Sequence, residues 1–376
     1  MINYLKRKFN IGYKYHPHAI ILACYFNPQH NPYRKKAFDV WYKSIKHLNH
    51  RIIECSINGS EFELPYTSNF VRVQTSDMLW HKETLLNKLI NQVLEEEKYK
   101  YIFWLDTDVL FTNNDWLVES CDILTYKPVV QPFTYCIHMN EGEYEPNISA
   151  ALQGKRTYLV NPIIAAKQLK CWRSFGANVY YNPDYPPSWK SENYDMHGHV
   201  GFAWGATAKC LESIGLLFDK ALIGGADHIM AHAFANQVPC SCITKSFGEH
   251  LPEIEAWSKQ AAKVVMGGIG ATSGDLYHIW HGDVEKRQYY KRVKEFTPLS
   301  QGKIERNDDG FYQSNDSSVT NYFVSYINDR EGFDTGLSIY DNIPIEIISN
   351  PDSSFDGGQF GGSGAGSDWE DAPTFS

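Results

Sequence analysis

Residues 101–111 read YIFWLDTDVLF, an apolar run of strand length that is interrupted only by Asp106 and Asp108. In a strand buried on both faces, two unpaired carboxylates would be costly. Open α/β sheets bind ligands at the carboxyl ends of their strands, and hard divalent cations prefer oxygen ligands. The run therefore predicts a buried strand that meets a metal or catalytic site. The alternative is an ordinary strand-to-loop turn, with Asp115 capping the next helix.

The segments around this run alternate between the periodicities of strands and helices. Strand-like runs are expected at 18–26, 51–57, 70–73 and 128–133. Helical stripes are expected at 33–48, 80–98 and 206–214, and in the apolar segment that ends near Phe234. This alternation predicts an α/β fold with a mixed, mostly parallel Rossmann-like sheet and helices on both faces. Asp106 and Asp108 would then lie near its switch-point crevice.

Of the 376 residues, 43% are hydrophobic and 14% are aromatic, which is enough for one large or two medium globular domains. We expect a main domain at 1–299, an extension at 300–349 that packs on it, and a disordered tail at 350–376. The tail is rich in Gly, Ser and Asp, a composition typical of disorder. In the extension, 321–326 and 344–348 are apolar enough to pack on the main body.

The net charge of -9 is unevenly distributed. Residues 1–56 hold ten Lys and Arg against two Asp and Glu, a net +8, whereas residues 307–376 hold one against thirteen, a net -12. The acidic total argues mildly against nucleic acid as an obligatory partner. The basic segment could still attract a polyanion locally, although a solvated helix face is its simpler interpretation.

The eight cysteines form no CxxC pair, and the two nearest in sequence, Cys240 and Cys242, are expected in a strand. Scattered reduced thiols favour a cytoplasmic protein. No apolar run approaches the about 20 residues that span a bilayer. The basic N-terminus is not followed by a hydrophobic region of signal-peptide length. We therefore expect a cytoplasmic protein without stable membrane insertion.

Three later segments could contribute to a site. Residues 156–200 are rich in aromatic residues and prolines and are expected to be an irregular binding loop or lid, although buried packing of the rings is equally compatible. Gly224-Gly225-Ala226-Asp227 would place a carboxylate at a helix start, where glycines let the backbone approach a ligand; a plain helix cap is the alternative. His278 and His281 flank a Trp, and the Lys286 and Arg287 that follow could help to clamp a diphosphate.

Taken together, residues 18 to 295 resemble the GT-A class of nucleotide-sugar-dependent glycosyltransferases. The motif Phe103-Trp104-Leu105-Asp106-Thr107-Asp108 is similar to the metal-binding Asp-x-Asp of that class. The segments Lys82-Glu83-Thr84-Leu85-Leu86-Asn87 and Gly224-Gly225-Ala226-Asp227 resemble motifs of the β-1,4-galactosyltransferase group. Ala226 departs from that pattern, because the family has an additional acid at this position.

The resemblance implies a role for each candidate residue. Asp108 and a His would hold Mn²⁺ or Mg²⁺, with Asp106 as a further candidate ligand. His281 is preferred to His278 because a glycine follows it. Lys82, Asp106 and Trp204 would contact the nucleotide sugar, for which a UDP-sugar is favoured. Lys286 or Arg287 would close over its phosphates. Asp227 would be the general base that deprotonates an acceptor hydroxyl, with inversion at the anomeric carbon.

Other activities are compatible with the same residues. In a haloacid-dehalogenase-like phosphatase, Asp106 would attack phosphate and Asp108 would act as the acid. A non-catalytic sugar-binding protein on the same fold is the third hypothesis. The acceptor is left open by the sequence: it could be a glycan, another hydroxyl compound or hydroxymethylated DNA.

Overall fold

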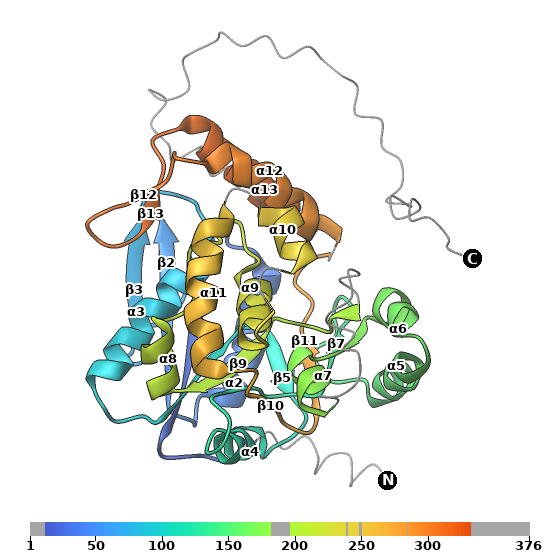
Figure 1. Ribbon diagram of the computed structural model, residues 1–376. Helices are drawn as coiled ribbons and strands as arrows, with labels where there is room; N and C mark the ends of the chain where they lie inside the picture. The colour runs from blue at the N-terminus through green and yellow to red at the C-terminus, as the bar shows by residue number, and fades with distance from the viewer. Residues whose placement is uncertain (1–11, 182–195, 238–239, 248–249, 284, 332–376) are drawn as a thin grey trace.

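The fold is built around a seven-stranded sheet in the order β10-β6-β9-β4-β1-β2-β3. The structure is a computed structural model and describes residues 12–181, 196–237, 240–247, 250–283 and 285–331 (Figure 1). The strands are β1 (Ala19–Tyr25), β2 (His50–Ile57), β3 (Phe70–Thr75), β4 (Tyr101–Leu105), β6 (Val129–Gln131), β9 (Ala203–Thr207) and β10 (Ile269–Ala271). β9 is antiparallel to both of its neighbours, whereas the other pairs are parallel. The expected mixed, mostly parallel sheet is confirmed.

Helices cover both faces of this sheet because its central strands are apolar on both sides. In β4, Ile102 and Trp104 belong to one buried cluster, whereas Phe103 and Leu105 belong to the other. The first cluster packs under α3 (Lys82–Glu95), α8 (Ala208–Ile214), α9 (Ala226–Phe234) and α11 (Leu251–Val265). The second packs under α2 (Pro32–Ile45) and α4 (Trp116–Ile123). Side chains that alternate between two apolar layers are typical of a strand buried on both faces.

The apolar run at 101–111 forms two strands and not one. β4 ends at Leu105, and β5 (Val109–Phe111) belongs to a second, four-stranded sheet in the order β5-β11-β7-β8. The other members are β7 (Tyr135–His138), β8 (Cys171–Arg173) and β11 (Asp275–His278). The turn is held by hydrogen bonds from Asp106 N to Phe202 O at 2.7 Å and from Ile279 N to Asp108 O at 2.8 Å. Both carboxylates therefore leave the buried sheet, as their desolvation cost requires.

Three other expectations were wrong in detail. Residues 156–181 are mostly regular: α5 (Ile148–Val160), α6 (Pro162–Leu169) and α7 (Phe175–Tyr181) surround β8. The side chains of Asn147 and Asn161 cap α5 and α6, and this local signal outweighs the aromatic, proline-rich composition. The helix expected from residue 206 begins two residues later, after strand β9. Cys240 and Cys242 are not in a strand, since α10 (Ser241–Phe247) begins between them. The rest of the expected loop, 182–195, lies outside the described residues.

The last described segments pack on the same core as the main sheet. They are η4 (Glu285–Arg287), α12 (Tyr289–Ser300), β12 (Glu305–Arg306), β13 (Tyr312–Gln313) and α13 (Ser317–Glu331). Phe323 and Ile327 of α13 are buried in the cluster that also contains Ile229 of α9. Residues 321–326, expected to pack on the main body, are part of this helix. The segment 344–348 and the tail at 350–376 lie outside the described residues, and the domain boundaries stay a prediction.

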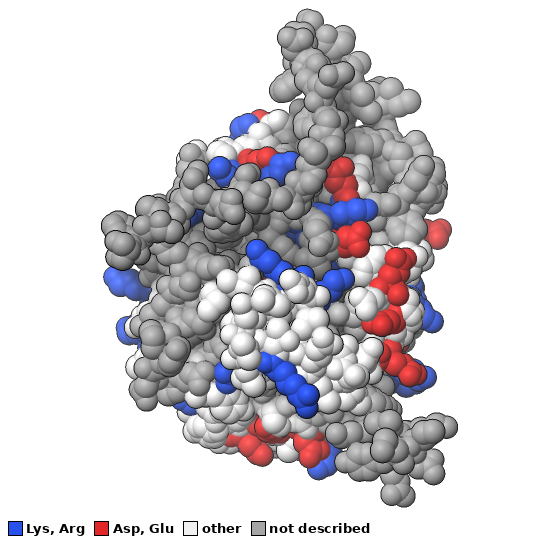
Figure 2. All heavy atoms as spheres, turned by 90° about the vertical axis from the view of Figure 1, so that its right-hand side faces the viewer, with Lys and Arg blue, Asp and Glu red and all other residues white. Residues whose placement is uncertain are grey.

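Helices α5 and α6 contain no Asp or Glu, and their three charged residues are the basic Lys155, Arg156 and Lys167. Leu159 and Val160, at the end of α5, are 75% and 87% exposed. Figure 2 looks onto this side of the molecule: a few blue side chains cross a white centre, and red side chains lie along the right-hand edge and at the bottom. Among the helices in the described part of the chain, none combines the length and the apolar composition of a membrane span. All eight cysteines are free thiols.

Candidate active site

A cavity of about 400 Å³ opens where β1 and β4 end. The beginnings of α3 and α9, the end of β11, the helices η4, α12 and α13, and residues of α2 and 198–202 also line it. Its charged lining residues are the acids Glu83, Asp106, Asp108 and Asp227 and the bases Arg34, Lys82, Arg287, Arg292 and Arg330. Acids and bases in nearly equal number suit an anionic ligand that binds together with a cation.

Lys82 joins two of these acids. Its Nζ lies 2.7 Å from Asp106 Oδ1 and 3.3 Å from Asp227 Oδ2. Burial raises the pKa of Asp106 to about 6, against the attraction of Lys82. Burial alone would lower the pKa of Lys82, but the two carboxylates hold it well above its ordinary value. One ammonium group thus neutralises carboxylates that come from β4 and α9, far apart in the sequence.

Asp108 faces two histidines instead. Its Oδ2 lies 3.0 Å from His281 Nε2 and 3.5 Å from His278 Nε2. The strand register explains this arrangement, because His278 pairs with Val109 across β11 and β5, next to Asp108. Burial would raise the pKa of Asp108, but the two histidines hold it well below its ordinary value. Burial lowers the pKa of His278, and that of His281 to about 3.

The Asp108 group has the features expected of a metal site. Asp108, His278 and His281 can each direct one ligand atom to a common point, within 4.8 Å of one another. Asp108 Oδ1 is buried and has no hydrogen-bond partner among the described residues. An Arg287 guanidinium nitrogen lies 3.3 Å from His278 Nε2 and 3.1 Å from His281 Nε2. The tautomer of each ring decides which contact forms: an Nε2 that accepts from the guanidinium presents a lone pair, whereas an Nε2 that donates to Asp108 carries the proton. A cation fits a point where such acceptor atoms converge.

The remaining sequence candidates separate into residues at the cavity and residues away from it. Arg287 is buried against the histidines, whereas Lys286 is exposed and does not line the cavity. Trp204, expected to contact the nucleotide sugar, is buried in the core. Its Nε1 donates to Val200 O at 2.7 Å, and its ring packs on Phe234. Asp106 is also absent from the group that could hold a metal, because its carboxylate faces Lys82.

The two glycines before Asp227 are required by the backbone. Gly224 and Gly225 have φ of +93° and +98°, a region that other residues rarely adopt. A Cβ on Gly224 would lie 2.7 Å from an Arg292 nitrogen, and one on Gly225 would lie 2.9 Å from the Phe247 ring. This tight turn starts α9 and places Asp227 in its first turn, at the cavity.

Sequence reasoning missed two features near this cavity. Glu83 is buried, and burial raises its pKa to about 8, so it is largely protonated at pH 7. A second group, His197, His228, His232 and Cys242, could also direct ligand atoms to one point. His228 and His232 are one helical turn apart, and this spacing is the only pattern in the sequence that could have indicated a pair of metal ligands. It does not indicate that His197 or Cys242 would join them.

Comparisons with known proteins add a general likeness of fold. No family model and no curated protein matches the chain. One similar solved structure is glucosyl-3-phosphoglycerate synthase from Mycobacterium tuberculosis with Mn²⁺, UDP and glucosyl-3-phosphoglycerate, at 10% identity and a TM-score of 0.34, covering 79% of this chain and 87% of that chain. Another is the mannosyltransferase PcManGT from Pyrobaculum calidifontis with GDP-Man and Mn²⁺, at 12% identity and a TM-score of 0.36, covering 87% and 79%.

A third similar structure is S. aureus TarS 1-349, at 8% identity and a TM-score of 0.34, covering 88% of this chain and 76% of that chain. Identities and scores this low give no basis for transferring an activity. The function is therefore argued from the side chains of this chain.

Proposed function

We propose that the protein is a metal-dependent glycosyltransferase that moves a sugar from a nucleoside diphosphate donor to a hydroxyl acceptor. The observation that carries this proposal is one cavity with two separate acidic groups in it. Asp108, His278 and His281 form a group that could hold a metal ion, and Asp106 and Asp227 form a second group joined by Lys82. The resemblance to GT-A enzymes and, more finely, to the β-1,4-galactosyltransferase group is part of this proposal.

The ligand set refines the choice of metal. Two imidazole nitrogens and one carboxylate are less oxygen-rich than the sequence suggested, and Mg²⁺ prefers oxygen ligands. Mn²⁺ is therefore the better of the two candidates. When bound, the cation would stabilise negative charge on the departing diphosphate.

The protein side chains would act on both substrates. Arg287, Arg292 and Arg34 bring positive charge to the cavity, where a diphosphate is a suitable partner. Lys82 and Asp106 would bind the nucleoside part of the donor, for which UDP is favoured by the resemblance. Asp227, the other partner of Lys82, would accept the proton of the acceptor hydroxyl as this oxygen attacks the anomeric carbon. Attack from the face opposite the leaving group gives inversion.

The test is a thermal-shift and hydrolysis screen of nucleotide sugars, with and without Mn²⁺. We expect one donor to stabilise the protein only with metal present. Asp108→Asn should abolish this stabilisation and the turnover, and Asp115→Asn is the matched control, because Asp115 forms an exposed ion pair with Lys14. If no nucleotide or nucleotide sugar binds with any metal, the proposal is wrong. If the product has the same anomeric configuration as the donor sugar, Asp227 is not the base of an inverting reaction.

The same screen separates the alternatives. Hydrolysis of phosphate monoesters in the absence of a sugar donor would support the phosphatase. Sugar binding that survives Asp108→Asn without any turnover would support the binding protein. The acceptor is tested with glycans, other hydroxyl compounds and hydroxymethylated DNA as three classes.

One observation favours a second candidate function. Two histidines and one carboxylate are also the ligand set of non-haem Fe²⁺ oxygenases. Oxygen uptake that depends on Fe²⁺ would support that activity. The five cationic side chains of the cavity favour a phosphorylated ligand and hence the glycosyltransferase.

A further inference from the structure

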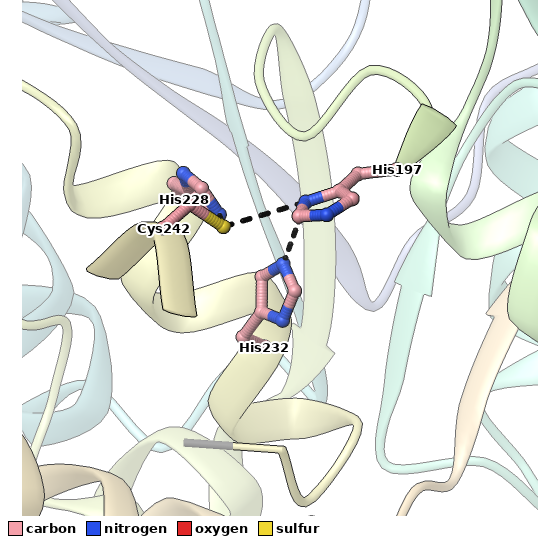
Figure 3. A group of neighbouring side chains, drawn as sticks. All are labelled: His197, His228, His232 and Cys242. Atoms are coloured by element: carbon pink, nitrogen blue, oxygen red, sulfur yellow. Dashed lines mark hydrogen bonds between the residues drawn. The ribbon is translucent and has the colours of Figure 1, made fainter. Parts of the chain in front are cut away.

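Three histidines and a cysteine converge next to the cavity, in a group that the proposed reaction does not use. His197, His228, His232 and Cys242 direct their ligand atoms toward one another, all within 4.8 Å (Figure 3). His228 and His232 lie one turn apart on α9, Cys242 lies on α10, and His197 precedes β9. Residues four apart on a helix share a face, so both α9 histidines meet the residues from the other two segments.

The distances match those expected around a small tetrahedral cation. His232 Nε2 lies 3.1 Å from His197 Nδ1, and Cys242 Sγ lies 3.4 Å from His228 Nε2 and 3.9 Å from His197 Nδ1. With Zn–N of about 2.0 Å and Zn–S of about 2.3 Å, tetrahedral geometry separates two nitrogens by about 3.3 Å and a nitrogen from a sulfur by about 3.6 Å. The four atoms therefore need only small shifts to bind one ion.

The environment also favours a metal over a hydrogen-bonded core cluster. His197 and His232 are fully buried. Burial lowers the pKa of His228 to about 4, so its ring is neutral at pH 7, as a metal ligand must be. Each neutral imidazole offers one ring lone pair and the cysteine, once deprotonated, offers a thiolate, so the four residues can supply four donor atoms to one cation.

We propose that His197, His228, His232 and Cys242 bind a Zn²⁺ ion. Imidazole and thiolate are the ligands that Zn²⁺ prefers, and four protein ligands make a closed, structural site. Cys240 Sγ lies 3.1 Å from Cys242 Sγ and 3.9 Å from His228 Nε2, at the edge of the group, and is not one of the four ligands.

The ion would fix the beginning of α9. Asp227 directly precedes His228, and the two glycines before it allow a backbone turn that most residues would resist. Zinc would tie this turn to α10 and to the residues before β9, so that Asp227 keeps its place at the cavity. The zinc site does not depend on the proposed function, because its ligands are distinct from Asp108, His278 and His281.

The experiment uses the full chain without a histidine tag, produced in zinc-supplemented medium and dialysed against a weak chelator. Elemental analysis should find one zinc per chain in the wild type, in Cys240→Ser and in Asp108→Asn. The zinc content per chain of Cys242→Ser should be at least tenfold lower. Cys210→Ser, which removes a buried thiol elsewhere in the chain, is the matched control and should keep its zinc.

Replacement of the metal by Co²⁺ gives a readout that does not depend on activity or on any variant. The wild type should show the intense visible bands of a tetrahedral site and a thiolate charge-transfer band. These bands should persist in Asp108→Asn, since the Asp108 group contains no sulfur. Loss of the bands in a folded Cys242→Ser, checked by circular dichroism, would identify the thiolate.

Two results would overturn the proposal. One is wild-type protein that contains no zinc and shows no thiolate–cobalt band. This includes the case in which Cys240 and Cys242 form a disulfide, which would lower the measured mass of the protein by two hydrogen atoms. The other is zinc that is lost from Cys240→Ser and retained in Cys242→Ser. Absence of glycosyl transfer with zinc present would refute the proposed function alone.

Discussion

Replacement of Lys82 by Met tests how the buried carboxylates are held. The Lys82 side chain is 14% exposed, and those of Asp106 and Asp227 are 27% and 24% exposed. At an effective dielectric constant of about 20, contacts at these distances are worth about 5 kcal/mol each before desolvation. Removing one partner of a buried pair costs about 3–5 kcal/mol in practice. Because the carboxylates are about a quarter exposed, we expect Lys82→Met to lose about 3 kcal/mol of unfolding free energy at pH 7.

The loss should depend on pH with a defined sign. Burial already raises the pKa of Asp106 to about 6, and removal of the ammonium raises it further. A carboxylate whose folded pKa lies above its unfolded value contributes stability that is present at low pH and lost as the pH rises through the folded pKa. The deficit of Lys82→Met should therefore shrink between pH 7 and pH 5.

The assay is urea denaturation of wild type and variant at pH 5, 6 and 7. Lys35→Met is the matched control, because Lys35 forms an exposed ion pair with Asp39 on the same helix. This control should lose less than about 0.5 kcal/mol at every pH. A Lys82→Met loss as small as that of the control, or one that is constant with pH, would refute the electrostatic role of Lys82.

Three further predictions concern other residues of the cavity and the core. Arg287→Met should weaken donor binding at least tenfold by calorimetry, whereas Lys286→Met should not, because only Arg287 faces the cavity; equal effects would contradict this assignment. Burial raises the pKa of Glu83 to about 8. The unfolding free energy of the wild type should therefore fall between pH 5 and pH 8, by at most about 1.4 kcal/mol per pH unit from this group. Glu83→Gln should remove this contribution. A difference between the two proteins that does not widen toward pH 8 would argue against a protonated Glu83. Trp204→Phe should cost about 1–3 kcal/mol in denaturation, through lost packing and its hydrogen bond to Val200, without changing the dissociation constant of the donor.

The central sheet could be predicted from the sequence because its strands are nearly continuous apolar runs. Residues 18–26 and 51–57 became β1 and β2 within one residue at each end. Helices α5 to α7 could not be predicted in the same way, since the segment lacks a clear apolar stripe. Helices α5 and α6 begin at asparagine caps, which are local signals that the aromatic and proline content obscured.

The candidate site was predicted in its residue types and only partly in its arrangement. Asp106 and Asp108 are two residues apart, and from the sequence both are candidate ligands of one ion. In the structure, the chain changes sheets between them, so that Asp106 meets Lys82 and Asp108 meets His278 and His281.

By itself, the sequence determined where the apolar strands lie. It also determined that one strand stops at Asp106, because the free-energy cost of burying a carboxylate depends on the residue itself and on the apolar residues next to it in the chain. Only the tertiary structure decided which charge meets each carboxylate and which histidines converge. Asp227, Lys82 and the two histidines beside Asp108 come together through strand register and helix packing, as do His197, His228, His232 and Cys242. Contacts between residues so far apart along the chain follow from the packing of the whole core, which no local pattern contains.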